Sequence, residues 1–166
     1  MPEPATRSVT VRETRTSPCG HRAGVTVRAL GTLECMLGHL GLNVPDLDRA
    51  RSYYGVLMPL FGFELFVDAE DQFAYMPVGG RRGTLLFFYR ASEDGAYSRV
   101  RPGLQHLAFI VPDRQAVIDV HETAMSLGST KVHTPQQWPQ YPPPYFAAFW
   151  LDPFGFMIEA VCHHDR

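Results

Sequence analysis

Two hydrophobic periodicities alternate along the chain from residue 36 onwards. An apolar run at 36–44 ends at Pro45 and Asp46, which stop a strand and can cap a helix. In the next segment, 47–63, apolar residues recur at helical spacing, at Leu47, Ala50, Tyr54 and Leu57 or Met58. Three short β-rich runs follow at 63–69, 72–78 and 84–91, separated by acidic or glycine-rich turns. The pattern predicts the order β, α, β, β, β.

The same pattern then begins again. Residues 104–128 repeat the order found at 37–62: an apolar strand with a central His, then Val-Pro-Asp, an amphipathic helix and a Gly-terminated turn. Three further strand candidates follow at 130–135, 145–152 and 154–163. We therefore predict an α+β fold of two tandem βαβββ modules, at about 36–92 and 103–163, whose mixed sheets curve into a cup. Both modules lie in a single domain, 35–166.

The first 34 residues differ from the rest. They are rich in Arg, Thr and Ser and carry little periodic hydrophobicity, so we expect a mostly disordered tail at 1–34. Two alternatives stay open. The segment can be upstream sequence translated from an early start, because Met36 stands directly before the first patterned strand, or it can be a mitochondrial-type presequence, which its three glutamates make the weaker option.

Composition narrows the classes of partner. The chain has 166 residues, 45% of them hydrophobic, and a net charge of −2, which suits one compact domain and gives no basic footprint for nucleic acid or an anionic membrane. No apolar run approaches the roughly 20 residues of a membrane helix. Three widely spaced cysteines, Cys19, Cys35 and Cys162, favour a reducing cytoplasm over a disulfide framework. We expect a cytoplasmic protein whose partner is a small molecule.

The repeat also places chemistry-bearing residues. His39 and His106 are each separated from Val-Pro-Asp by four residues, so they occupy equivalent places on equivalent strands. Glu159 lies among apolar residues of the last strand, where an unpaired carboxylate is expensive to bury. Two imidazoles and one carboxylate suit a divalent ion, Fe, Mn, Ni or Zn, with coordination positions left open. Taken singly, each His is more often a satisfied core residue, and Glu159 could instead pair with Arg90 or Arg101.

At these residues the chain resembles a known superfamily. The repeated H-x-x-x-x-V-P-D strands and the closing D-P-x-G-x-x-x-E element, Asp152 to Glu159, are similar to the vicinal oxygen chelate superfamily over residues 37–163. That superfamily contains glyoxalase I, extradiol dioxygenases, fosfomycin-resistance thiol transferases, methylmalonyl-CoA epimerase and bleomycin-binding proteins. The resemblance implies a glyoxalase-like fold and metal ligands from the first strand of each module and the last strand of the second: His39, His106 and Glu159.

At several positions the chain lacks residues that are typical of individual branches of the superfamily. Phe87 aligns with Glu159, so the fourth ligand of glyoxalase I and the epimerase is missing. Phe149 and Gln140 stand where extradiol dioxygenases have a Tyr and an acid/base His. The basic residues that bind phosphonate in the fosfomycin branch have no clear counterparts, and Lys131 is the only lysine.

Aromatic residues are the candidate substrate contacts. Phe87 and Phe149 share the face of Glu159 by strand spacing, so we expect them to face the cup. The proline-rich segment 134–146 carries Trp138, Tyr141 and Tyr145, and it either lids the cup and stacks on a substrate or only stiffens an exposed crossing. The predicted substrate-binding residues are Phe87, Tyr145, Phe149 and Trp138.

Two functions from different classes follow. The first is a metal-dependent enzyme, a glyoxalase-like lyase or isomerase, a dioxygenase or a thiol transferase, whose ion binds adjacent substrate oxygens. The alternative is a metal-free protein that sequesters an antibiotic between aromatic walls. We also expect a homodimer, because relatives pair or swap modules and strands such as 84–90 would otherwise expose sheet edges. His21, His121 and His133 are predicted to be surface or loop residues, and His163 to Asp165 a solvated tail.

Overall fold

The computed structural model describes residues 37–164 of the chain. The predicted tail at 1–34 and the chain end at 165–166 lie outside the described residues, as do His21, Cys19 and Cys35. Within the described part, no helix is long and apolar enough to cross a membrane.

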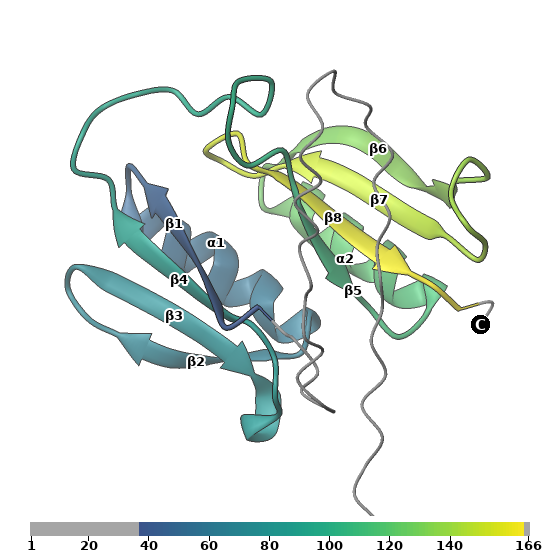
Figure 1. Cartoon of the computed structure of the whole chain (residues 1–166), viewed down its shortest axis with the longest axis horizontal. Helices are drawn as coiled ribbons and strands as arrows, with labels where there is room; N and C mark the ends of the chain where they lie inside the picture. Colours follow the sequence, from purple (N-terminus) through teal and green to yellow (C-terminus); the bar gives the residue numbers. More distant parts are fainter. Residues whose placement is uncertain (1–36, 165–166) are drawn as a thin grey trace, which may run out of the picture. The chain divides into compact units, whose positions relative to one another are not determined.

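Two modules with the same element order make up the described chain (Figure 1). The first contains β1 (His39–Val44), α1 (Leu47–Leu60), β2 (Phe63–Asp68), β3 (Gln72–Pro77), the 3-10 turn η1 (Val78–Gly80) and β4 (Leu85–Arg90). The second contains β5 (Leu107–Ile110), α2 (Arg114–Ser126), β6 (Thr130–Gln137), β7 (Phe146–Leu151) and β8 (Met157–Cys162). The predicted pair of βαβββ modules is therefore confirmed.

Each module forms a four-stranded mixed sheet with the same topology. The strand orders are β1-β4-β3-β2 and β5-β8-β7-β6, and in each sheet the first strand pairs in parallel with the last strand of its module. The other pairings are antiparallel. β1 and β5 are thus equivalent edge strands, and β4 and β8 are equivalent inner strands.

The two helices begin at equivalent caps. The side chain of Asp46 accepts a hydrogen bond from the Arg49 amide at 2.9 Å, and that of Asp113 accepts one from the Ala116 amide at 2.8 Å. Each cap satisfies an amide that the first helical turn leaves without a backbone partner. Asp46 was predicted in this role, and Asp113 repeats it at the same place in the second Val-Pro-Asp.

One hydrophobic core joins both modules. The apolar residues predicted to face inward from the first helix are all buried there, together with Phe73 and Phe88 of the first sheet and Trp150 and Ile158 of the second. Phe61 stacks on Phe109 of β5 with ring centroids 4.3 Å apart. The Trp150 indole donates a hydrogen bond to the Tyr53 hydroxyl at 2.9 Å, which links β7 to α1. The second sheet thus presents one face to the helices and leaves the other for a separate cluster.

The turn between β7 and β8 is organised by Asp152, the first residue of the D-P-x-G-x-x-x-E element. Its buried carboxylate accepts hydrogen bonds from the amides of Phe154 and Phe156 at 2.9 and 2.8 Å and from the Tyr54 hydroxyl at 2.7 Å. Burial raises the pKa of Asp152, and these hydrogen bonds oppose the rise. Asp152 therefore sets the start of β8 and joins it to α1.

Two expectations are wrong. Residues 84–90 were expected to form an exposed edge, but β4 lies between β1 and β3 and both of its sides are paired. His121 was expected at the surface, but its side chain on α2 is buried, with its ring centroid 6.1 Å from that of Trp150. The helical spacing Val117, Val120, His121 and Ala124 places His121 on the buried face of α2, a signal that the prediction overlooked.

The buried His121 predicts sensitivity to acid. Its Nε2 has no hydrogen-bond partner in the described chain, and burial, followed by the charge of Lys131, lowers the pKa of the ring, while Glu122 opposes this. Below about pH 6.5 the unfolded chain therefore takes up a proton that the folded protein resists, so stability falls as the pH falls. We expect the melting temperature of His121→Leu to fall less between pH 7.5 and 5.5 than that of the wild type. His133→Leu, an exposed control, should show the same fall as the wild type. Equal losses in all three proteins would contradict the prediction.

Candidate functional site

The second module brings two of the predicted ligands together. Glu159 lies in the middle of β8, next to β5 through the parallel pair Ala108 and Glu159, and His106 directly precedes β5. The carboxylate is 1% exposed, and its Oε2 lies 3.1 Å from His106 Nε2. The salt bridges of the described residues do not include the alternative pairing of Glu159 with Arg90 or Arg101. His106 itself is part-exposed, so the pair is open on the histidine side.

The second carboxylate oxygen is held by Tyr145. The Tyr145 hydroxyl donates a hydrogen bond to Glu159 Oε1 at 2.6 Å. Burial, followed by the hydrogen bond to Glu159 and its charge, raises the pKa of Tyr145, so the hydroxyl keeps its proton at neutral pH. Both oxygens of a nearly inaccessible carboxylate therefore have polar partners. Sequence reasoning identified Tyr145 as aromatic substrate wall and missed this contact.

The other nitrogen of His106 also has a partner. His106 Nδ1 contacts the side-chain oxygen of the adjacent Gln105. When Nδ1 carries the proton and donates it to this oxygen, the lone pair of Nε2 is directed at the side of Glu159. Metal-binding histidines are commonly fixed by such a second hydrogen bond. Nothing in the local pattern of residues assigns this role to an exposed glutamine.

Aromatic rings surround Phe149, the residue opposite Glu159 in the β7–β8 pair. The ring centroids of Trp138, His133 and His106 lie 5.1, 5.8 and 6.2 Å from that of Phe149, all with edge-on geometry. The Trp138 indole donates a hydrogen bond to the Ala147 carbonyl at 3.1 Å, which fixes its orientation. We call Phe149, Trp138 and His133 the second-sheet aromatic cluster. Phe149 lies on the same face of the sheet as Glu159, as predicted, and Trp138 lies beside Phe149.

His133 and His163 were predicted to be solvated, but both make ring contacts near the candidate site. His133 is exposed as expected, but it lies on β6 and belongs to this cluster. His163 is exposed, and its ring centroid lies 5.0 Å from that of Tyr145. Both histidines therefore stand near the His106–Glu159 pair without contacting the carboxylate in any described hydrogen bond.

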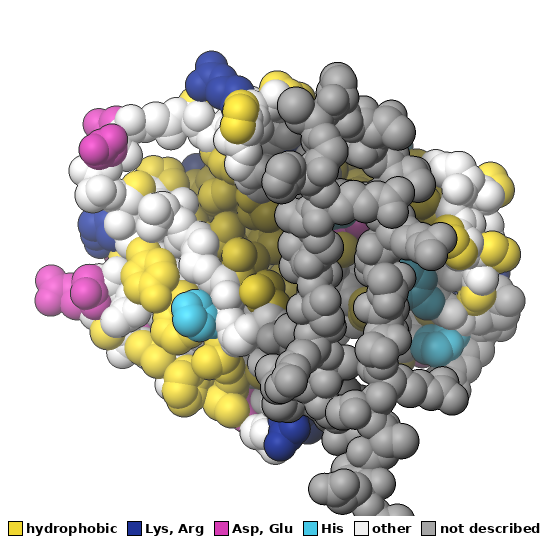
Figure 2. All heavy atoms as spheres, in the orientation of Figure 1, with side chains coloured by type: hydrophobic (Ala, Val, Ile, Leu, Met, Phe, Trp, Pro, Cys, Tyr) yellow, Lys and Arg dark blue, Asp and Glu magenta, His cyan; other side chains and the backbone are white. Residues whose placement is uncertain are grey.

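The first module supplies a different surface. His39 is exposed at the start of β1, with its ring centroid 5.9 Å from that of Phe87, and Phe87 stacks on Tyr89 at 5.9 Å. Gly41 pairs with Phe87, as Ala108 pairs with Glu159, and each follows its histidine by two residues. Phe87 therefore occupies the position equivalent to Glu159, as the sequence alignment of the modules predicted. Hydrophobic side chains gather over this sheet (Figure 2).

The fit to a metal ion is partial. Two ligand atoms that each lie about 2.1 Å from one ion, at tetrahedral or octahedral angles, are about 3.0–3.4 Å apart. The 3.1 Å between His106 Nε2 and Glu159 Oε2 agrees with that spacing. However, within residues 37–164 no group of three or more His, Cys, Asp and Glu side chains is arranged to hold a metal ion, so His39 does not join the pair. Two of the three predicted ligands fit, and the third is not assembled in the single chain.

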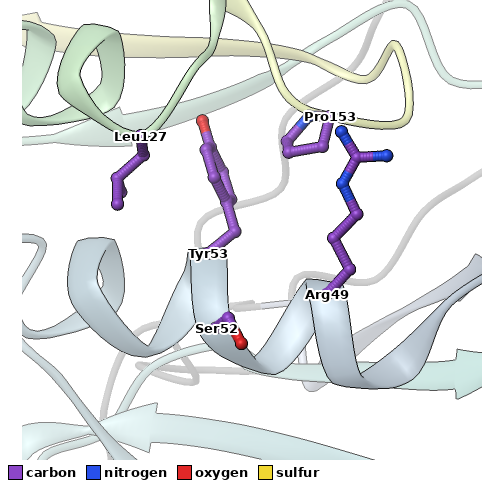
Figure 3. A pocket seen from close by; sticks show the side chains of 5 residues that line it. All are labelled: Arg49, Ser52, Tyr53, Leu127 and Pro153. Carbon is purple, nitrogen blue, oxygen red and sulfur yellow. The ribbon is translucent and has the colours of Figure 1, made fainter.

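A shallow cavity lies elsewhere, on the helix side of the fold. It measures about 160 Å³ and is lined by Arg49, Ser52, Tyr53, Leu127 and Pro153 (Figure 3). Tyr53 is already engaged through its hydroxyl by Ser129 at 2.6 Å and by Trp150. The Arg49 guanidinium lies over the Phe154 ring at 5.6 Å. None of the lining residues belongs to the His106–Glu159 pair or to the second-sheet aromatic cluster, so this cavity is separate from the candidate site.

Comparison with known proteins agrees with this architecture. The family model of the Glyoxalase/Bleomycin resistance protein/Dioxygenase superfamily matches residues 36–160. A Bacillus halodurans protein provisionally described as a glyoxalase has a TM-score of 0.67 at 23% identity, with 78% of this chain and 96% of that chain covered. A glyoxalase/dioxygenase from Nostoc punctiforme has a TM-score of 0.63 at 22% identity, with coverages of 86% and 100%. At these identities the solved structures support the fold alone. No curated protein matches the sequence.

Proposed function

Because the chain belongs to the glyoxalase/bleomycin resistance protein/dioxygenase superfamily, we propose that it is a metal-dependent enzyme that acts on a small molecule. His106 and Glu159 are the proposed ligands from the second module and His39 the third, for one divalent ion of the Fe, Mn, Ni or Zn type. The reaction is that of a lyase, isomerase, dioxygenase or transferase. A cytoplasmic location, expected from the cysteines, accompanies the proposal.

The observation that carries the proposal is the buried carboxylate of Glu159 facing His106. A carboxylate that is 1% exposed needs a cation or strong donors to offset its desolvation. Tyr145 supplies one donor, and Oε2 faces only the edge of an imidazole whose other nitrogen contacts Gln105. A divalent ion between Nε2 and Oε2 would offset the remaining cost. When bound, such an ion supplies Lewis-acid stabilisation of an anionic oxygen on the substrate.

The surrounding residues would bind and shield the substrate. The second-sheet aromatic cluster presents apolar ring surface beside Glu159, which suits a substrate with a planar or apolar portion. Phe87 takes the equivalent place on the first sheet, where it stacks on Tyr89. Because Phe87 replaces a fourth ligand, more coordination positions are left for substrate oxygens or water than in a four-ligand site.

A homodimer would explain how His39, which is not near the His106–Glu159 pair in the single chain, could bind the same ion. β1 and β5 are the edge strands of their sheets, and His39 stands on one while His106 stands at the start of the other. A two-fold arrangement that sets β1 of one copy beside β5 of the next would cover both edges and bring His39 of the partner subunit to the His106–Glu159 pair. The proposed dimer therefore forms through β1 and β5, since β4 is an inner strand.

The mass in solution tests this arrangement. We expect light scattering of the purified protein to give about twice the 18.7 kDa of one chain. His39→Ala should keep that mass and lose bound metal, because it removes a ligand and leaves the strand edges in place. A mass near 18.7 kDa that does not change with concentration would exclude the dimer.

A metal-free antibiotic-binding protein is the second candidate. It is favoured by the ring cluster around Phe149, whose apolar ring surfaces suit a planar ligand. The two candidates differ in metal content: near-stoichiometric transition metal in the purified protein supports the enzyme. Quenching of Trp138 fluorescence by bleomycin, unchanged by EDTA and lost in Trp138→Phe, would support the binding protein instead.

A further inference from the structure

The cavity on the helix side of the fold is lined by both modules (Figure 3). Arg49, Ser52 and Tyr53 line it from α1, while Leu127 ends α2 and Pro153 lies in the turn between β7 and β8. Its volume of about 160 Å³ is smaller than the roughly 300 Å³ or more of sites for drug-sized ligands. Apolar cavities of about 150 Å³ nevertheless hold a benzene molecule. The space therefore fits one small molecule, such as a single ring.

The walls of the cavity are apolar. Figure 3 shows Leu127 and Pro153 on either side of the Tyr53 ring, which is itself buried. The Ser52 hydroxyl donates a hydrogen bond to the Asp48 carbonyl at 2.9 Å, and its side chain points away from these three residues. Ser52 therefore adds no free donor. A ligand in the cavity would contact one aromatic ring and two aliphatic side chains, which favours an apolar body.

The Arg49 guanidinium gives the cavity a positive rim. It lies over the Phe154 ring, 5.6 Å from the centroid, and reaches toward Pro153 in Figure 3. Within the described chain it takes part in no salt bridge, and the neighbouring Asp48 pairs with Arg51 at 3.1 Å instead. A guanidinium presents its donors in a planar fork that matches a carboxylate. Arg49 is therefore a cation that no described acid pairs with, beside a space that a small anion can enter.

The Tyr53 hydroxyl has capacity for one more contact. It accepts a hydrogen bond from the Trp150 indole at 2.9 Å, and it shares another with the Ser129 hydroxyl at 2.6 Å, in which either can donate. The two hydroxyls carry two hydrogens and use one between them, so one is left over in either case. No hydrogen bond within the described chain takes this remaining hydrogen. When Ser129 donates, the remaining hydrogen belongs to Tyr53, which lines the cavity and can donate to an acceptor there.

A buried acid beside the cavity limits the charge of the ligand. Asp152 precedes Pro153, and its side chain is buried. Burial raises the pKa of Tyr53 to about 12, and the charge of Asp152 contributes to the rise, so this charge acts at the cavity wall. The Tyr53 hydroxyl therefore keeps its proton at neutral pH. A dianion such as phosphate would be repelled by Asp152 more strongly than an anion with one charge.

We propose that this cavity binds a small monocarboxylate with an apolar body, whose carboxylate contacts Arg49 and accepts the remaining hydrogen from Tyr53. The apolar body packs between Leu127 and Pro153. The site lies outside the His106–Glu159 pair and does not depend on the proposed function. Because its walls come from both modules, a bound ligand joins them and stabilises the folded chain.

The test uses benzoate as the probe and the amide signals in the NMR spectrum of the full chain as the readout. We expect benzoate to shift the amides of Leu127 and Phe154. It should bind Arg49→Gln at least about tenfold more weakly than the wild type, because the charge-assisted hydrogen bonds to the guanidinium are lost. Arg82→Gln is the matched control: it removes the same charge from an exposed residue that does not line the cavity, and it should bind benzoate like the wild type.

Two further probes test the charge of the ligand in the wild-type protein. Benzamide has nearly the shape of benzoate without its charge, and inorganic phosphate carries the second charge that Asp152 opposes. Each should bind at least about tenfold more weakly than benzoate. The proposal would be overturned by equal affinity of benzoate for wild type and Arg49→Gln, by equal affinity of benzoate and benzamide, or by shifts confined to Trp138 and its neighbours. A spectrum that benzoate leaves unchanged would also overturn it.

Discussion

His106→Ala is expected to abolish metal binding by the purified protein. The substitution removes the imidazole whose Nε2 lies 3.1 Å from Glu159 Oε2. Of the proposed ligands it leaves only Glu159 and His39 of the partner subunit, and two ligands are too few to retain a transition metal through dialysis. Elemental analysis after dialysis should fall from near one equivalent per chain to background. If turnover of a small-molecule substrate is found, it should fall with the metal content.

The matched control is His133→Ala. Both histidines stand edge-on to Phe149, at 6.2 and 5.8 Å between ring centroids, but only His106 contacts Glu159. The control should therefore keep its metal while losing the same kind of ring contact. Equal metal content in wild type, His106→Ala and His133→Ala would place the ion elsewhere, and background content in all three would favour the metal-free binding protein.

Asp152→Ala is expected to destabilise the fold by about 3–5 kcal/mol, because it leaves three hydrogen-bond donors without their acceptor at a buried site. These donors are the amides of Phe154 and Phe156 and the hydroxyl of Tyr54, and the last bond joins the two modules. The free energy of unfolding from urea denaturation measures the effect. Metal affinity should also fall, because β8 begins at this turn and carries Glu159.

Asp119→Ala serves as the control for Asp152→Ala. Asp119 is exposed on α2 and its side chain accepts a hydrogen bond from Gln115 at 2.8 Å, so its loss should change the unfolding free energy by about 0.5 kcal/mol or less. Similar losses in the two variants would mean that the D-P-x-G turn does not hold the modules together. The role of the D-P-x-G-x-x-x-E element would then be limited to supplying Glu159.

Local pattern was sufficient for the elements of this fold. The helical spacing from Leu47 to Met58, the cap at Asp46 and the turn glycines Gly62 and Gly128 are all signals carried within a few residues. Gly62 and Gly128 follow the helices with φ values of 77° and 83°, a conformation that glycine adopts without strain. The repeat then supplied the architecture, because two copies of one pattern fold into two copies of one module.

Strand alternation also placed part of the site. Once Glu159 is assigned to one face of its strand, Phe149 in the paired strand follows it, and Phe87 follows by equivalence of the modules. These inferences need only the two-residue period of a strand and the repeat. They do not need to know how the modules pack or which side chains meet.

Contacts between segments distant in the sequence were decided by the tertiary structure alone. The hydroxyl of Tyr145 reaches Glu159 because a closed loop directs its ring, and His121 is buried because α2 packs that side toward Trp150. The pairing of β4 on both sides depends on a parallel crossover that its own sequence does not encode. The sequence thus determined the modules and the faces of their strands through local periodicity. Which side chains became partners depended on packing, since burial and hydrogen-bond geometry arise only when separate segments are brought together.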